Sequence, residues 1–198
     1  MTKLFFATDI HGSDICWSKF LNAGKFYGAD VLILGGDMTG KALVPFIHLG
    51  GKNYRVTLLE QVFDISNDDE LQDFIKRVRS RGYYPYLTSP DEIAELEKDP
   101  ERVHQIFMNE VLKVIQQWMD LADKKLDGTD MNVYCCPGND DMSEVDDIVR
   151  ASRRVLLVEG QVTSLDGTHE MIASGWSNRT PWDTHREEDE EQLEARYE

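Results

Sequence analysis

The fold is decided by residues 3–37, KLFFATDIHGSDICWSKFLNAGKFYGADVLILGGD. The two apolar runs in this stretch, at 3–8 and 30–35, have the length and composition of short buried strands. Between them Ser13 is placed to cap a helix, and four apolar residues follow at roughly helical spacing: Ile15, Phe20, Leu21 and Phe26. Strand, helix and strand within about 35 residues form a βαβ unit, which requires parallel strands. The sequence therefore predicts an α/β fold.

The rest of the chain continues this alternation of strands and helices. Its predicted elements are a hairpin in 43–62, helices within 66–128, a strand at 132–137, a short helix near 143–152, and strands in 154–175 with a turn at Asp166-Gly167. No repeat or low-complexity linker interrupts them. We therefore expect a single domain over residues 1–198, with a helical insertion at about 50–130.

Composition narrows the classes of function. The net charge of −16 argues against a nucleic-acid backbone as partner, because phosphate backbones are bound by clustered Lys and Arg. No run approaches the ~20 apolar residues that a membrane span needs. The three cysteines, Cys16, Cys135 and Cys136, suggest no disulfide framework, and on a strand the adjacent pair would point to opposite faces. We expect a cytoplasmic protein that does not enter a membrane.

Polar residues follow three of the predicted strands. Asp9 and His11 follow the first strand and Asp37 follows the second, while the third ends in Gly138, Asn139, Asp140 and Asp141. Since functional groups gather at the carboxyl ends of parallel strands, these side chains are expected to converge on one crevice. Asp9 and His11 are two residues apart, so an extended backbone would point both the same way. Carboxylate, imidazole and amide ligands together favour Mn, Fe, Zn or Mg.

Two other interpretations compete with a metal site. Residues 35–42, GGDMTGKA, nearly match a phosphate-binding loop, and this reading predicts ATP affinity that depends on Lys41. Against it, Ala42 lacks the hydroxyl that binds Mg²⁺, Asp37 puts a carboxylate in an anion cradle, and Pro45 disturbs the helix that should follow. The second alternative is that Asn139, Asp140 and Asp141 form only a turn and a helix cap.

The three motifs together resemble the calcineurin-like metallophosphoesterase superfamily, in particular a microbial branch of predicted phosphoesterases. The resemblance rests on D-x-H at Asp9 and His11, G-D at Asp37, and G-N-[HD]-[DE] beginning at Gly138. It implies a β-sandwich flanked by helices in α-β-β-α layers. It also implies two divalent metal ions: Asp9 and His11 would bind the first, Asp37 would bridge both, and Asn139 would bind the second.

The activity implied by this resemblance is hydrolysis of phosphomonoesters or phosphodiesters, with a small phosphate ester as substrate and Asn139 and Asp140 as catalytic residues. Two departures from the family pattern qualify it. Asp140 stands where most members have a histidine, which predicts slower or altered chemistry. Downstream of Asn139 only His169 and His185 occur, and neither lies in the G-H-x-H motif of the family. His169 is expected to be structural, and His185 is a candidate substitute ligand.

The missing histidines lead to two further expectations. We expect the chain to be C-terminally incomplete relative to the family. They also keep open an alternative function, an impaired or incomplete module that binds metal, ligand or a partner without catalysis. The terminal run at 186–198, REEDEEQLEARYE, is expected to be either a solvated helix or a frayed tail.

Overall fold

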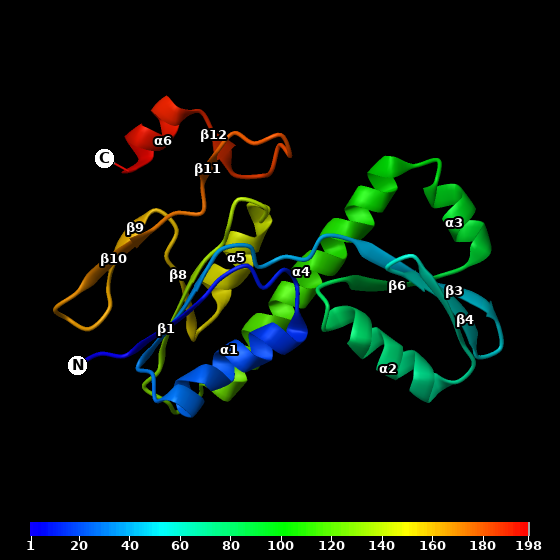
Figure 1. The fold of residues 1–198 in the computed structure, drawn as a ribbon, viewed down its shortest axis with the longest axis horizontal. Helices are drawn as coiled ribbons and strands as arrows, with labels where there is room; N and C mark the ends of the chain where they lie inside the picture. The colour runs from blue at the N-terminus through cyan, green and yellow to red at the C-terminus, as the bar shows by residue number, and fades with distance from the viewer. Residues whose placement is uncertain (198) are drawn as a thin grey trace. The chain divides into compact units, whose positions relative to one another are not determined.

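The computed structural model describes residues 1–197 and has mixed α/β content (Figure 1). The chain divides into two compact units. Unit 1 comprises Met1–His11, Cys16–Thr39 and the chain from Val114 onward, and unit 2 comprises Gly12–Ile15 and Gly40–Lys113. Both units are therefore discontinuous in sequence.

Unit 1 is built on a parallel sheet with the strand order β1-β2-β7-β8. Its strands are β1 (Leu4–Ala7), β2 (Val31–Gly35), β7 (Asn132–Cys136) and β8 (Val155–Leu157). Every pairing between neighbours is parallel, which confirms the βαβ prediction. The two central strands, β2 and β7, are buried on both faces, and this explains why their sequences are continuous apolar runs.

One face of this sheet packs against helices. The helices of unit 1 are α1 (Asp14–Tyr27), the second half of α4 (Pro100–Lys125) and α5 (Glu144–Ala151). Phe5 of β1 stacks on Tyr27 of α1 with ring centroids 5.4 Å apart. Trp17 and Trp118 stack at 5.3 Å, and the Trp17 indole N–H donates to the Trp118 carbonyl at 3.0 Å. This buried pair joins α1 to α4 because the indole N–H finds an acceptor inside the core.

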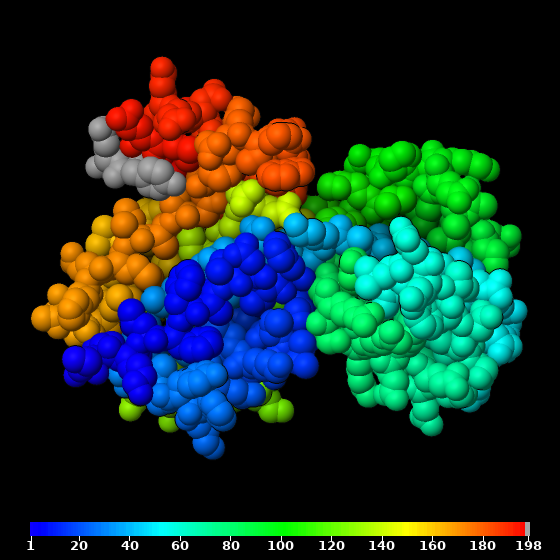
Figure 2. Space-filling model, viewed as in Figure 1, coloured from blue at the N-terminus to red at the C-terminus, as the bar shows by residue number. Residues whose placement is uncertain are grey.

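The opposite face packs against an antiparallel hairpin, β9 (Gln161–Ser164) and β10 (Glu170–Ala173). The shared cluster contains Val31, Ile33, Tyr134, Cys136 and Val158, with Leu165, Met171 and Ala173 against it. Figure 2 shows the hairpin, gold to orange, at the surface beside the N-terminal residues in dark blue. There the Thr2 hydroxyl donates to Asp166 Oδ2 at 2.5 Å. The hairpin predicted at Asp166-Gly167 is confirmed.

The chain of unit 1 ends with short elements. Strand β11 (Ser177–Asn178) pairs in parallel with β12 (Glu187–Glu188), and helix α6 (Glu190–Tyr197) follows. The terminal run is therefore helical over most of its length, whereas Arg186 and Glu187 at its start are buried. Glu198 lies outside the described residues.

Unit 2 has a sheet of its own with the order β5-β4-β3-β6. Its strands are β3 (Leu43–Gly50), β4 (Asn53–Leu58), β5 (Gln61–Ile65) and β6 (Tyr84–Thr88). The predicted β3–β4 hairpin is confirmed, and β3 pairs in parallel with β6. Helices α2 (Asp68–Arg79) and α3 (Pro90–Leu96) are capped by the side chains of Asn67 and Ser89. The unit has its own apolar cluster around Phe46, Val56 and Val78.

The predicted helical insertion at about 50–130 needs correction. The segment contains three strands as well as helices, and unit 2 begins at Gly40 and ends at Lys113, inside α4. The second half of α4 belongs to unit 1 because its apolar stripe, including Val114, Ile115 and Trp118, is buried there. Among the helices that the structure describes, not one is both long and apolar enough to cross a bilayer.

Candidate metal centre

Three strand ends meet at the carboxyl edge of the parallel sheet. Strands β1, β2 and β7 are neighbours, so the loops that follow them come together. Asp9, His11 and Asp37 each offer one ligand atom, and these three atoms lie within 4.8 Å of one another. The sequence prediction that residues far apart in the chain converge here agrees with this geometry. Strand order explains it, because functional groups collect where parallel strands end side by side.

The backbone after β1 is turned and not extended. Asp9 has φ of 52° and His11 has φ of 41°, values that non-glycine residues rarely adopt. The expectation that an extended strand aligns these two side chains is therefore wrong. The turn is held by the His11 N–H, which donates to the Asp37 carbonyl at 3.1 Å, and Thr8 Oγ1 donates to Asp9 Oδ2 at 2.5 Å. Left-handed conformations at non-glycine residues are concentrated at functional sites.

The His11 imidazole shows that the donor set fits a cation. Its Nδ1 is buried and has no hydrogen-bond partner among the described residues. The carboxylate oxygen Oδ2 of Asp37 lies 3.9 Å away, beyond hydrogen-bonding distance. A buried ring nitrogen without a partner is costly unless something satisfies it. An ion held by two carboxylates and this nitrogen would do so, and imidazole with carboxylates suits Zn, Fe or Mn.

Asp37 lies between the two other loops. Its side chain is largely buried (the residue is 8% exposed), and its Oδ1 accepts the backbone N–H of Asp140 at 3.2 Å. Burial raises the pKa of Asp37 first of all, and the carboxylates of Asp141 and Asp140 raise it further, against the opposing effects of the Asp140 N–H and His11. One oxygen of this carboxylate thus faces the His11 loop and the other faces the loop after β7.

The loop after β7 carries the other two predicted residues, Asn139 and Asp140, both half-buried. A Cβ at Gly138 would lie 2.2 Å from Asp37 Oδ1 and 2.5 Å from the Asp37 nitrogen, so only glycine permits this approach. The Asn139 side-chain nitrogen donates to Thr184 Oγ1 at 2.9 Å. The backbone of this loop therefore lies next to Asp37, while the Asn139 side chain is tied to the C-terminal segment.

Asp141 has a role that the sequence did not reveal. It is 0% exposed, and its carboxylate accepts the backbone N–H groups of Met38, Thr39 and Gly138 at 2.8–3.1 Å and the Thr39 hydroxyl at 2.7 Å. The residue thus ties the loop after β2 to the loop after β7. The turn interpretation of Asn139, Asp140 and Asp141 holds in part, since the Asp141 N–H donates to the Gly138 carbonyl at 3.2 Å.

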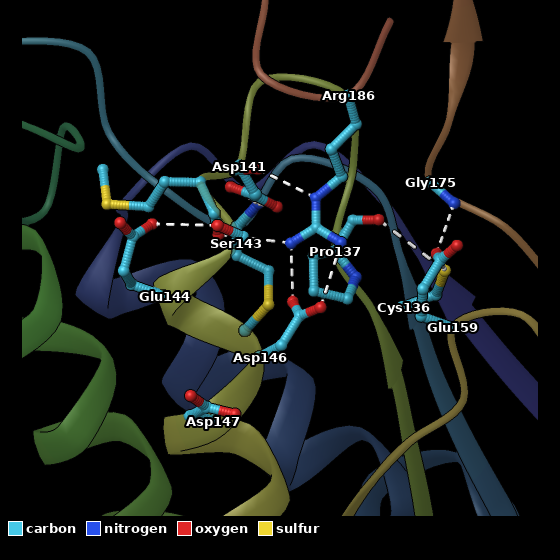
Figure 3. Close-up of polar contacts among 12 residues, drawn as sticks. Cys136, Pro137, Asp141, Ser143, Glu144, Asp146, Asp147, Glu159, Gly175 and Arg186 are labelled. Atoms are coloured by element: carbon cyan, nitrogen blue, oxygen red, sulfur yellow. Dashed lines mark hydrogen bonds and ion pairs between the residues drawn. The ribbon is translucent and has the colours of Figure 1, made fainter. Parts of the chain in front are cut away.

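Arg186 is a second residue that sequence reasoning missed (Figure 3). It is 4% exposed although it opens a run of charged residues. Its guanidinium forms a bidentate pair with Asp146 at 2.5 and 3.2 Å and donates to the carbonyls of Asp141 and Met142. Its backbone N–H donates to the Asn139 carbonyl at 3.0 Å. The planar guanidinium can donate to all of these acceptors at once, which a lysine ammonium could not do. Arg186 thereby anchors the loop that carries Asn139.

Glu187 closes the C-terminal loop. Its carboxylate accepts the hydroxyls of Thr180 and Thr184, each at 2.5 Å, and the backbone N–H groups of the same two residues. These hydrogen bonds, the Thr180 hydroxyl first, lower the pKa of Glu187 to about 2 from an ordinary 4.5. The ionised form is thus the one that stabilises the loop.

A pH dependence follows for Glu187→Gln. Because the pKa is lowered in the folded state, the carboxylate stabilises the fold above about pH 4.5, and this contribution is lost as pH falls toward 2. We expect Glu187→Gln to unfold at lower temperature than the wild type at pH 7, with the gap narrowing between roughly pH 5 and pH 3. Thermal unfolding followed by tryptophan fluorescence measures it, with Glu191→Gln, an exposed residue of α6, as control. A gap that is independent of pH would contradict the assignment.

The remaining candidates lie elsewhere. His185 is exposed and is absent from the three-residue cluster found among the described residues. The His169 ring contacts Asp166 Oδ2 at 2.9 Å, which supports a structural role. The phosphate-loop reading of residues 35–42 lacks its helix, because strand β3 follows directly. Lys41 instead lines a mostly apolar cavity of about 550 Å³ within unit 2, together with Pro45, Phe107 and others.

The adjacent cysteines point to opposite faces, as predicted. Cys135 Sγ lies 3.1 Å from Met38 Sδ, while Cys136 contacts Glu159 Oε2 at 3.2 Å and packs in the cluster under the hairpin. Burial raises the pKa of both thiols well above the usual range. None of the three cysteines forms a disulfide, and the buried pair is unsuited to bind metal as thiolates.

Comparison with known proteins gives no assignment. No protein-family model matches the chain, and no curated protein and no solved structure matches it.

Proposed function

We propose that this chain is a metal-dependent hydrolase of phosphomonoester or phosphodiester bonds. The observation that carries the proposal is the Asp9, His11 and Asp37 cluster, with ligand atoms within 4.8 Å and a buried His11 Nδ1 that lacks a hydrogen-bond partner. The parallel sheet with helices on one face and a hairpin on the other also supports a helix-flanked sandwich of the metallophosphoesterase type. A reducing, cytoplasmic setting is part of the same proposal.

Each residue has a distinct part in this chemistry. Asp9 and His11 would hold the first divalent ion, Asp37 would be shared by two, and the Asn139 amide oxygen would contribute to the second. When bound, such a pair of ions lowers the pKa of water toward ~7 and neutralises charge on the phosphoryl group. This would explain how a protein of net charge −16 handles an anionic ester. Asp140 would stand near the phosphoryl group, and a carboxylate at that position is expected to give slower or altered chemistry.

Metal removal and replacement tests the proposal. Protein stripped with EDTA is expected to lose hydrolysis of 4-nitrophenyl phosphate and bis(4-nitrophenyl) phosphate, and to recover it on addition of Mn²⁺. Elemental analysis of the reconstituted protein should give two equivalents of metal per chain. Comparing the two esters distinguishes monoesterase from diesterase activity. Absence of turnover with Mn²⁺, Fe²⁺, Zn²⁺ and Mg²⁺ alike would overturn the assignment as a hydrolase.

A second candidate is a module that binds one metal ion without catalysis. It is favoured by the small size of the cluster, because His169 and His185 do not join Asp9, His11 and Asp37. Asn139 would then be the main additional ligand for a second ion. The two functions differ in stoichiometry: one tightly bound equivalent without turnover supports the module, and two equivalents with turnover support the enzyme.

A further inference from the structure

The side-chain amide of Asn139 belongs to a chain of hydrogen bonds that ends at a carboxylate. Asn139 Nδ2 donates to Thr184 Oγ1 at 2.9 Å, and Thr184 Oγ1 donates to Glu187 Oε1 at 2.5 Å. The Thr184 backbone N–H donates to the same carboxylate oxygen at 3.0 Å. Glu187 is itself buried and receives two further bonds from Thr180. We call Asn139, Thr184 and Glu187 the amide relay.

The number of hydrogens available along the amide relay determines which group donates and which accepts in each hydrogen bond. An ionised carboxylate only accepts hydrogen bonds, so the single hydroxyl hydrogen of Thr184 is committed to Glu187. The Thr184 hydroxyl then has only lone pairs to offer Asn139, so it accepts a hydrogen bond from that side chain. The Asn139 amide must therefore offer its NH₂ group to Thr184, in agreement with the contact of 2.9 Å from Nδ2. The amide oxygen is left for another partner.

Two backbone hydrogen bonds fix the position of the loop that carries Asn139. The Arg186 N–H donates to the Asn139 carbonyl at 3.0 Å, and on the other side the Asp140 N–H donates to Asp37 Oδ1 at 3.2 Å. Asn139 is thus placed between the C-terminal segment and the cluster that contains Asp37. Its side chain can offer a cation only the oxygen, because the nitrogen is engaged with Thr184.

We infer that Thr184 and Glu187 are positioning residues that keep the Asn139 oxygen available to the second metal ion. This inference rests on the proposed function of the site. Groups that orient a metal ligand without contacting the ion typically change metal affinity by 10–100-fold when mutated. The missing downstream histidines make this orientation more important, since the second ion has few other ligands here. The C-terminal segment therefore contributes to the centre without supplying a ligand.

Thr184→Val tests the inference because valine keeps the shape of threonine and removes the hydroxyl. We expect Mn²⁺ affinity for the second equivalent to fall about 10–100-fold by titration calorimetry, with the first equivalent unchanged. Thr180→Val is the matched control, since Thr180 also donates to Glu187 at 2.5 Å while Asn139 bonds to Thr184. Thr184→Ser restores the hydroxyl and should restore the affinity. Equal affinity for the second ion in wild type and Thr184→Val would overturn the inference.

A second readout separates this inference from the proposed function. In the metal-free protein, the ¹⁵N–¹H resonances of the Asn139 side-chain NH₂, assigned by their loss in Asn139→Asp, should shift in Thr184→Val and stay in place in Thr180→Val. Unchanged resonances in Thr184→Val would refute the relay even if the enzyme is active. Wild-type protein that binds no metal would refute the proposed function and the positioning role, while the NH₂ shift would still decide the hydrogen bond. If Thr184→Val does not fold, Thr184→Ala replaces it, since it removes the same hydroxyl, with the same two readouts and the same direction expected.

Discussion

Replacing Asp37 with asparagine is expected to lower kcat/KM for phosphate-ester hydrolysis by about 10³-fold or more. Metal ions stabilise transition-state charge by several kcal/mol, and each ~1.4 kcal/mol corresponds to a tenfold change in rate. Asp37 is the residue whose carboxylate lies between the loop of His11 and the loop of Asn139. Its loss would weaken the binding of both ions. The measurement is Mn²⁺-dependent hydrolysis of an aryl phosphate, together with metal content by elemental analysis.

Asp37→Asn also distinguishes a loss of catalysis from a loss of folding stability. Asparagine has nearly the same shape, and its amide oxygen can still accept the Asp140 N–H that Asp37 accepts. Burial already raises the pKa of Asp37, so an uncharged replacement removes an unfavourable buried charge in the metal-free state. We therefore expect metal-free Asp37→Asn to be at least as stable as the wild type. Asp127→Asn, an exposed acid, is the control, and wild-type turnover in Asp37→Asn would refute the proposed function.

Replacing Asp141 with asparagine is expected to destabilise the protein by about 3 kcal/mol. The buried carboxylate accepts from three backbone N–H groups and the Thr39 hydroxyl. An amide has only one acceptor oxygen, so its NH₂ group would face backbone donors and leave them unsatisfied, at about 1–3 kcal/mol each. Urea denaturation of metal-free protein measures the effect as a lower midpoint with an unchanged slope.

The control for Asp141 is Asp147→Asn on helix α5. Asp147 is exposed and pairs with Arg150 at 2.5 Å on the surface, so its loss should change stability by about 0.5 kcal/mol or less. A shift for Asp141→Asn as small as that of Asp147→Asn would show that the loops after β2 and β7 are not held together by this carboxylate. The comparison holds because both substitutions remove one negative charge.

The parallel sheet of unit 1 was predictable because its signals are local. Apolar runs with polar ends identified β1, β2 and β7, and the Asp166-Gly167 turn identified the last hairpin. Strands β5 and β6 were missed for a physical reason: both lie at sheet edges, and β6 contains Pro85. Such strands carry little apolar periodicity, so the sequence pattern predicts no strand there. Helix α4 is divided between the two units by tertiary packing, and the apolar stripe in its sequence does not show where that division falls.

The candidate site was predicted in part. Asp9, His11 and Asp37 follow apolar strands and could be recognised, although the turn that aligns Asp9 with His11 could not. Arg186 and Thr184 cannot be identified from the sequence because they lie outside helices and strands, where burial follows no regular hydrophobic periodicity. The sequence shows Arg186 only as a member of a charged run. Its burial depends on Asp146 and on two carbonyls that are distant in sequence.

The discontinuous path of unit 1 has a consequence for biosynthesis. Strand β2 pairs with β1 directly, but its other neighbour, β7, is translated only after the whole of unit 2. At roughly 5–20 residues per second, the nascent chain would present the open side of β2 for several seconds before the ribosome delivers its partner. Unpaired strand edges invite association with other chains, so a chaperone that shields the first two strands would raise the yield of native protein.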